Sequence, residues 1–178
     1  VGRLCEYHSS AISQEVLPVL VTALVASLED RSSKVASQGC YAIHNLAAAC
    51  IDDSEAQTNV LSQFMPHILQ KLLVVANRED WDSDNLRAGA YEAANSLVAN
   101  SALDMRQTGI QVAHEALNRL EGTLTMQTEA QERMTLQSLL CALISACVQK
   151  LTSHDIKPLA DRIMNAVLQV FNSKGAVA

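Results

Sequence analysis

The chain has 178 residues, of which 49% are hydrophobic and 3% aromatic, and a formal net charge of -6. A core with so few aromatic rings depends on closely packed small and aliphatic side chains, and period-2 alternation is hard to find, so the composition predicts an all-α fold. The 13 scattered Lys and Arg residues argue against nucleic acid as a partner, whereas the 19 Asp and Glu residues favour a basic protein partner.

Apolar residues recur with the helical period in seven segments, which short polar turns separate. The segments span residues 16–29, 32–51, 58–76, 84–101, 105–126, 128–151 and 155–173. Turns this short are typical of antiparallel neighbours. Residues 1–8 look like the last turns of a further helix whose start is missing, so we interpret the chain as a fragment of a longer protein.

Three prolines stand near the starts of alternate predicted helices. Pro18 and Pro66 are 48 residues apart, and Pro66 and Pro158 are 92 residues apart, which is twice 46. Proline suits the first turn of a helix, because no intrahelical N–H bond is lost there. A period of about 46 residues that contains two helices lies in the HEAT/armadillo range. We therefore predict a HEAT-repeat α-solenoid, a superhelix of antiparallel helix pairs.

Each predicted repeat joins a first helix, A, to a second helix, B. The second helices can be superposed by sequence, because their matching stretches begin at Val35, Leu86 and Leu136, which are 51 and 50 residues apart. The chain then forms one solenoid segment of about three and a half repeats. Its parts are the end of a B helix at 1–8, A/B pairs at 16–51, 58–101 and 105–151, and a lone A helix at 155–173.

A helical wheel divides each B helix into two faces. On the first B helix, one face carries the expected packing stripe of Val35, Gly39, Ala42, Ile43, Leu46 and Cys50. The opposite faces of the first two B helices carry the predicted partner-binding residues Ser37, Tyr41, His44, Asn45, Glu92, Asn95 and Ser96. The third B helix repeats the pattern with Ser138, Ala142, Ser145 and Gln149. We expect these stripes to form a concave wall, the surface on which helical solenoids bind extended partners.

An acidic run precedes the second B helix and contains Glu79, Asp80, Asp82 and Asp84. Such a run either attracts a basic ligand or forms a solvated turn, and the solvated turn is the simpler interpretation. Asp84 is also a plausible N-cap, because an aspartate side chain accepts hydrogen bonds from the first N–H groups of a helix.

The sequence offers little support for a catalytic or metal site. Cys40 and His44 stand four residues apart on one helix, but a structural zinc needs four ligands and only these two converge. No HExxH, GxSxG, P-loop or GxGxxG motif occurs, and Cys–His catalysis needs a cleft that short-linked helix pairs seldom provide. We therefore predict neither an enzyme nor a bound metal or cofactor.

The cysteines and the apolar runs bear on the location of the protein. The five cysteines lack CxxC spacing and lie in helical patterns, as free thiols of a reducing compartment do. The longest apolar run, Val16 to Leu28, is too short to span a bilayer, and no signal or transit peptide opens the chain. We expect a protein of the cytosol or nucleus without membrane insertion.

Several collinear stretches carry a family resemblance that covers almost the whole chain. They are "VGRLCEYH" and "LPVLVTALVASLEDRSSKVASQGCYAIHNLAAAC", followed by "ILQKLL", "DNLRAGAYEA...LVANSA" and "LQSLLCAL". The first two resemble a repeat in which "VGRICE" precedes a B helix of the type "RVASNVCWAF..LAEA". The later stretches follow in the same order and at nearly the same spacing. That repeat belongs to the middle of the importin beta family of HEAT-repeat nuclear import receptors.

The resemblance implies a receptor of the cytoplasm, the nucleus and the nuclear pore. Its inner B helices would bind basic cargo or the basic importin-beta-binding arm of importin alpha. Ran-GTP would compete with this basic partner and release it from the receptor. Its outer A helices would bind phenylalanine-glycine nucleoporins, although no distinctive motif for such a slot stands in these A helices. Tyr41 falls where the family has a tryptophan that stacks on basic side chains of the arm. The alternative is a HEAT-repeat scaffold that organises a multi-subunit complex such as a phosphatase.

Overall fold

The structure is a computed structural model that describes residues 15–50 and 56–175. Every regular element within these residues is a helix and none is a strand, so the predicted all-α class is confirmed. None of the helices in these two ranges combines the length and the apolar character needed to cross a membrane. The predicted helix end at residues 1–8 lies outside the described residues.

Seven α-helices and two short 3-10 turns run through the described residues. The helices are α2 (Leu17–Leu28), α3 (Ser33–Ala49), α4 (Met65–Val75), α5 (Leu86–Ala99), α6 (Arg106–Thr123), α7 (Ala130–Lys150) and α8 (Ser153–Gly175). The 3-10 turns are η2 (Ser83–Asn85) and η3 (Leu103–Met105). Each predicted helical segment corresponds to one α-helix, and α8 extends beyond its segment, 155–173, at both ends. The largest shift is at α4, which starts well inside segment 58–76 because residues 60–64 form turns.

The helix starts explain where the prolines lie. Pro18 and Pro66 occupy the first turns of α2 and α4, as predicted. Pro158 does not, because α8 begins earlier, at a reciprocal pair of bonds between Thr152 and Asp155. The Thr152 N–H donates to Asp155 Oδ2 at 3.0 Å, and the Asp155 N–H donates to Thr152 Oγ1 at 3.3 Å. The prediction that all three prolines mark first turns is therefore wrong for Pro158, which lies inside α8.

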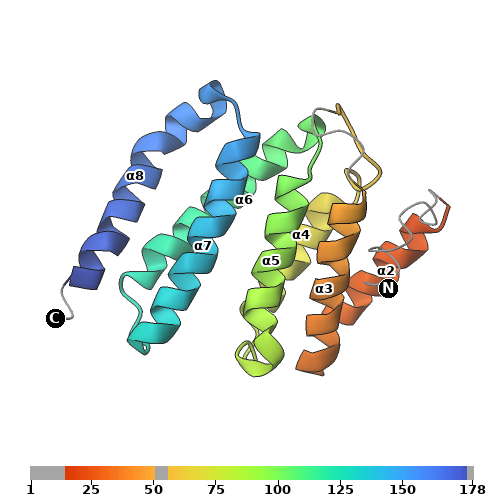
Figure 1. The fold of residues 1–178 in the computed structure, drawn as a ribbon, viewed down its shortest axis with the longest axis horizontal. Coiled ribbons are helices and arrows are strands. Elements are labelled where there is room, and N and C mark those ends of the chain that lie inside the picture. The colour runs from red at the N-terminus through yellow and green to blue at the C-terminus, as the bar shows by residue number, and fades with distance from the viewer. Residues whose placement is uncertain (1–14, 51–55, 176–178) are drawn as a thin grey trace. The chain divides into compact units, whose positions relative to one another are not determined.

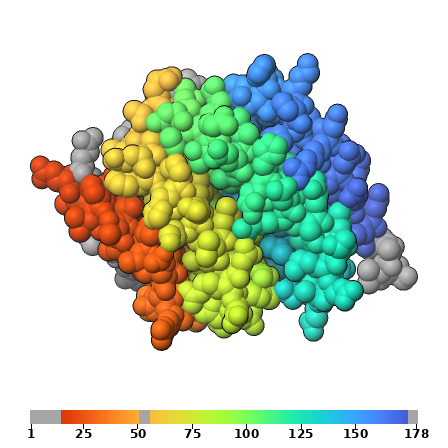
Figure 2. All heavy atoms as spheres, turned by 180° about the vertical axis from the view of Figure 1, so that it is seen from behind, coloured from red at the N-terminus to blue at the C-terminus, as the bar shows by residue number. Residues whose placement is uncertain are grey.

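The contacts divide the chain into two compact units, residues 1–105 and 106–178. In the first unit α3 and α5 lie side by side, with α4 behind them (Figure 1). The reverse view shows α2 and α4 on the opposite face of this unit (Figure 2). The unit therefore has two helix layers, α3 with α5 and α2 with α4. Its core lies between the layers and includes Leu28, Ile43, Leu46, Ile68, Leu72 and Leu86.

The second unit contains α6, α7 and α8. Helix α6 packs along α7, and α8 packs against both. The buried side chains of Leu117, Leu120, Leu140, Leu143 and Cys147 form its core. A buried hydrogen bond from Gln137 Nε2 to Thr123 Oγ1, 3.0 Å long, satisfies two polar groups within this core.

One residue of the predicted packing stripe on α3 is misplaced. Val35 was expected to pack but is 41% exposed. Helix α3 packs against α2 in the other layer and against α5 in its own, and it also contacts the turn η2. Its buried surface is therefore wider than one stripe and includes Ala36, Cys40 and Ala47, whereas Val35 falls at its edge.

Candidate functional site

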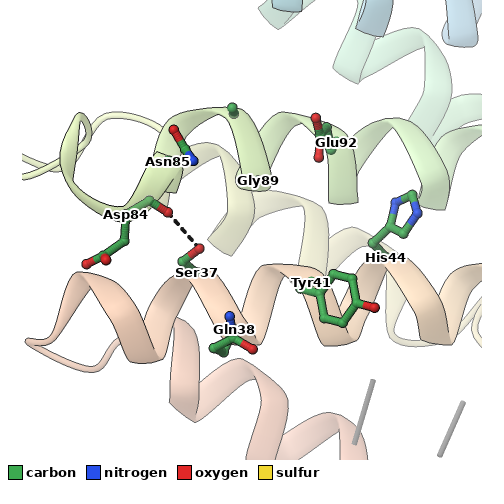
Figure 3. Close-up of a pocket in the computed structure, with 9 residues that line it drawn as sticks. Ser37, Gln38, Tyr41, His44, Asp84, Asn85, Gly89 and Glu92 are labelled. Atoms are coloured by element: carbon green, nitrogen blue, oxygen red, sulfur yellow. Dashed lines mark hydrogen bonds between the residues drawn. The ribbon is translucent and has the colours of Figure 1, made fainter. Parts of the chain in front are cut away.

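A groove of about 490 Å³ runs between α3 and α5 of the first unit (Figure 3). We call it the α3–α5 groove. The residues that line it are Ser37, Gln38, Tyr41, His44, Asp84, Asn85, Ala88, Gly89 and Glu92. Asp84 and Asn85, together with the first half of α5, form one side of the groove. The polar face of α3 forms the other side.

Small residues let α3 and α5 approach closely beneath this groove. A Cβ atom placed on Gly89 of α5 would lie 3.6 Å from the Cβ atom of Cys40, which is fully buried in α3. Further along, Ser96 Oγ of α5 donates a hydrogen bond of 3.1 Å to the carbonyl oxygen of His44. The two helices are thus joined directly by packing and by a side-chain hydrogen bond.

Two serines of α3 join Asp84 at one end of the groove. Ser33 Oγ donates to Asp84 Oδ2 at 2.7 Å, and Ser37 Oγ donates to the Asp84 carbonyl oxygen at 2.9 Å. Asp84 and Asn85 both have a left-handed backbone, with φ of 53° and 56°. Residues other than glycine adopt this conformation at an energetic cost, although Asp and Asn tolerate it better than most. We call Ser33, Ser37 and Asp84 the serine latch.

The predicted role of Asp84 as an N-cap is wrong. Asn85 occupies the N-cap position of α5, and no side-chain capping bond forms there. The Asp84 carboxylate instead reaches across to Ser33 on the neighbouring helix. The left-handed turn at Asp84 and Asn85 directs it there, away from the first N–H groups of α5.

The charges on the groove walls favour a cation. The lining includes two acidic residues, Asp84 and Glu92, and no Lys or Arg. The Asp84 carboxylate accepts a hydrogen bond from Ser33, so Glu92 is the acid that remains for a ligand in the groove. In Figure 3 the Asp84 carboxylate points away from Glu92, at the end of the groove occupied by the latch. Glu92 is exposed on α5, and Tyr41 and His44 stand across from it on α3. A groove with an exposed tyrosine ring on one wall and a carboxylate on the other suits a lysine or arginine side chain, because the ring face and the carboxylate both attract positive charge.

The rest of the acidic run does not belong to this site. Glu79, Asp80 and Asp82 do not line the groove. Arg78 Nη2 lies 2.8 Å from Asp80 Oδ2, and this hydrogen bond holds the pKa of the Asp80 carboxyl below its usual value. The carboxylate of Asp80 is therefore already paired within the first unit.

The structure places four of the seven predicted binding residues in the groove, namely Ser37, Tyr41, His44 and Glu92. Asn45 and Asn95 are half-buried and lie outside it. Asn45 Nδ2 and Asn95 Oδ1 are buried without a hydrogen-bond partner in the described part of the chain. Ser96 is only 9% exposed, so its predicted place on an open face is corrected: it packs between the two B helices, against α3.

Sequence reasoning missed Gln38, Asn85 and Gly89 as lining residues. Gln38 was missed because the helical wheel was divided into two opposite stripes. Residues between the two stripes, such as Gln38, were assigned to neither. Gly89 could have been found, because a glycine in the middle of a helix often marks a close approach of another helix. The left-handed turn at Asn85 has only a weak signal in the sequence, namely two consecutive residues, Asp84 and Asn85, of types that tolerate this conformation.

The structure also shows the environment of Cys40 and His44. Burial raises the pKa of the Cys40 thiol to about 12, whereas His44 is exposed in the groove. The two side chains therefore occupy different environments, one in the core and one on the surface. Among the described residues, no group of three or more His, Cys, Asp and Glu side chains is arranged to hold a metal ion.

A second groove, of about 300 Å³, lies between the C-terminal ends of α2 and α4. We call it the α2–α4 groove. Both of these ends contribute apolar and charged residues to its lining, which consists of Leu28, Glu29, Asp30, Arg31, Lys71, Val74, Val75 and Arg78. Arg78 fixes this end of α2, because its guanidinium donates to the carbonyl oxygens of Asp30 at 2.7 Å, Arg31 at 3.2 Å and Leu28 at 3.3 Å. Val74 is 61% exposed.

Comparison with known proteins gives a consistent result along the chain. A family model of the TPR repeats of importin subunit beta-1-like proteins matches residues 19–178. Importin subunit beta-1 of Arabidopsis thaliana is 32% identical over the whole chain, which spans 22% of that protein. The chain thus covers about a fifth of the length of the curated relatives that it matches.

Solved structures agree in fold. A crystal structure of importin beta in a polyethylene glycol condition superposes on 96% of the chain with a TM-score of 0.86 and 31% identity, over 21% of that protein. Two Kap95 structures are 24% identical, have TM-scores of 0.84 and support the fold alone. One is a complex of Kap95 with Nup1, and the other shows that Kap95p binding induces the switch loops of RanGDP to adopt the GTP-bound conformation.

Proposed function

This chain belongs to the importin beta family of nuclear transport receptors, and we propose that its α3–α5 groove binds basic side chains of an import partner. The partner would be basic cargo or the importin-beta-binding arm of importin alpha. The family consists of transport receptors rather than enzymes, so the proposed activity is binding and release. Family membership favours this role over that of a scaffold for a multi-subunit complex.

The observation that carries the proposal is the composition of the α3–α5 groove. Tyr41 is 48% exposed on α3 and lines the groove opposite Glu92 of α5, and no Lys or Arg lines the groove. Within the described residues, no hydrogen bond or ion pair engages the Glu92 carboxylate. A lysine or arginine that enters here gains a cation–π contact, worth about 0.5–1 kcal/mol at an exposed site, and a charge-assisted bond to Glu92. His44 completes the proposed contact surface, and Ser37 lines the groove with its hydroxyl bonded to the Asp84 carbonyl oxygen.

Further proposed partners come from the relatives. We propose that Ran-GTP competes with the basic partner, as the family resemblance implies, and that the chain acts in the cytoplasm, the nucleus and at the nuclear pore. The Kap95 structure that concerns RanGDP is consistent with a Ran partner. Because the affinity of a wrapped partner is spread over many repeats, this chain alone would bind each partner weakly.

A nucleoporin contact is the second candidate function, and the α2–α4 groove is the observation that favours it. The groove exposes Val74 beside Leu28 and Val75, on the layer opposite to the α3–α5 groove. A phenylalanine ring would bury apolar surface there. The solved complex of Kap95 with Nup1 supports a nucleoporin as a partner of this chain. Titration with a phenylalanine-glycine peptide should shift the NMR signals of Val74 and Val75, and the variant Val74→Asp should abolish the shifts.

The main proposal can be tested by calorimetric titration of the chain with a synthetic Lys/Arg-rich peptide at low and at physiological salt. We expect binding that weakens with salt, because exposed charge pairs are screened. Glu92→Gln should reduce the affinity. Glu129→Gln is the charge-matched control, since Glu129 is exposed in the second unit, and it should leave the affinity unchanged. Salt-insensitive binding, or equal effects of the two variants, would contradict the proposal.

The Ran step is tested with the longer receptor that contains these repeats. Its complex with the importin-alpha arm should dissociate when Ran-GTP is added and persist with Ran-GDP. If the arm stays bound under both conditions, competition by Ran-GTP is excluded.

A further inference from the structure

The serine latch closes one end of the α3–α5 groove with residues that are remote in sequence. Ser33 and Asp84 are 51 positions apart, and Ser37 and Asp84 are 47 apart. Two serines one turn apart on α3 thus bind the side chain and the backbone of the same aspartate. The latch joins the start of one B helix to the turn that begins the next.

The turn that the latch holds is unfavourable by itself. Asp84 and Asn85 are consecutive left-handed residues, and neither is a glycine. No side-chain capping bond at Asn85 stabilises the start of α5. A conformation of this kind persists only where the surroundings hold it, and the two hydroxyls of α3 are the groups that contact it from the neighbouring helix.

The groove depends on this turn. Ser37, Asp84 and Asn85 all line it, and α5 carries Glu92 two turns further on. The register of α5 against α3 therefore sets where the Glu92 carboxylate stands relative to the Tyr41 ring. At the latch end, the Asp84 carbonyl oxygen accepts a hydrogen bond from Ser37. The Asp84 carboxylate is turned out of the groove towards Ser33.

We propose that Ser33 and Ser37 are positioning residues of the binding groove, which hold the left-handed turn at Asp84 and Asn85 and thereby align Glu92 with Tyr41. This inference rests on the proposed function of the groove. The serines need not touch the bound peptide. They act through the turn, so their loss should weaken binding without unfolding the first unit, whose core lies elsewhere.

The test compares Ser33→Ala/Ser37→Ala with the control Ser173→Ala. Ser173 is matched in residue type, and its hydroxyl bonds only within α8, to the Val170 carbonyl oxygen. We expect the double variant to bind the Lys/Arg-rich peptide about threefold to tenfold more weakly, the effect of about one hydrogen bond, because the serines act on the peptide only through the turn. Its far-ultraviolet circular dichroism should stay that of the wild type, and the control should bind normally.

A rescue separates positioning from general stabilisation. Glycine adopts the left-handed conformation without a steric cost, so Asn85→Gly in the double-alanine background should recover part of the lost affinity. If the two serines merely stabilised α3, a glycine at position 85 would not recover the lost affinity. If the double variant binds as tightly as the wild type, or if Asn85→Gly recovers nothing, the positioning role is overturned.

A second measurement does not depend on any ligand. NMR coupling constants of Asp84 and Asn85 report φ directly. Both should change in the double-alanine variant, and that of Asp84 should return in the rescued one. Unchanged couplings would overturn the latch even if the peptide binds. A wild-type chain that binds no basic peptide overturns the proposed function and the positioning role with it, whereas normal wild-type binding with an insensitive double variant overturns the positioning role alone.

Discussion

Gly39 of α3 packs directly on Ser27 of α2, so closely that a Cβ atom added to the glycine would overlap Ser27 Oγ. The same atom would also lie 3.3 Å from Leu28 Cδ2. Gly39→Ala should therefore lower the free energy of unfolding by about 1–3 kcal/mol, the usual range for an overpacked site. Chemical denaturation followed by circular dichroism measures the change.

Two variants control this prediction. Gly89→Ala adds a methyl group in ordinary contact, 3.6 Å from Cys40 Cβ, so better helix propensity should leave stability unchanged or slightly higher. Ser27→Ala combined with Gly39→Ala removes the hydroxyl that clashes, and it should restore much of the loss. Equal stability of Gly39→Ala and the wild type would show that the two helices are further apart than the structure has them.

Tyr41 should contribute to binding and not to folding. Its ring is 48% exposed, so Tyr41→Ala should leave helicity and thermal stability close to those of the wild type. The affinity for a Lys/Arg-rich peptide should fall about twofold to fivefold, which corresponds to one exposed cation–π contact. Tyr41→Phe keeps the ring and should bind almost normally, whereas Tyr41→Trp should bind more tightly. Loss of folding in Tyr41→Ala would mean that the ring belongs to the core.

Periodicity predicted the helices because each one buries an apolar face, and this signal is local. The predictions fail where a second neighbouring helix decides which residues are buried, or where a turn decides where a helix starts. Val35 is exposed and Ser96 is buried because α3 and α5 also pack on each other, which a wheel of one helix cannot show. Pro158 lies inside α8 because a pair of bonds between Thr152 and Asp155 starts the helix earlier than the proline.

Only part of the candidate site was predicted, because the helical period reveals the faces of single helices but not the contacts between them. Tyr41, His44 and Glu92 were found because their face of the helix carries no packing stripe. The turn at Asp84 and Asn85 was not predicted, since the tolerance of Asp and Asn for the left-handed conformation is a weak local signal and the contacts of Asp84 come from a helix some 50 positions earlier. The division of the chain into three and a half repeats, and its continuity as one solenoid segment, stay predictions.

The bond between Arg162 and Glu121 should make the second unit sensitive to acid. Arg162 of α8 lies 2.7 Å from Glu121 Oε2 of α6, and this hydrogen bond lowers the pKa of Glu121 below its ordinary value of 4.5. A group whose pKa is lowered on folding stabilises the folded state above its unfolded pKa, and the contribution is lost as the pH falls through the folded pKa. The same contact raises the pKa of Arg162, which therefore stays charged throughout this range.

Melting temperatures measured from about pH 6 down to about pH 3 test this expectation. Below about pH 4.5 the wild type should lose more stability than Glu121→Gln, which has no carboxyl group to protonate at this position. Arg162→Met should behave like Glu121→Gln, because it removes the partner that lowers the pKa. The contact is partly exposed, so the difference should be small. Parallel curves for all three proteins would show that the pair does not form in solution.

The thiols of Cys40 and Cys147 should be unreactive in the folded protein. Both side chains are fully buried, and burial raises the pKa of each to about 12. Because the thiolate is the nucleophile, almost none of either residue is reactive near neutral pH. Iodoacetamide should therefore modify them only after the chain unfolds, when their pKa returns to about 8.5. Mass spectrometry of peptides from native and denatured samples measures both rates. Rapid native labelling of Cys40 would contradict its place in the core, and would reopen a chemical role for Cys40 with His44.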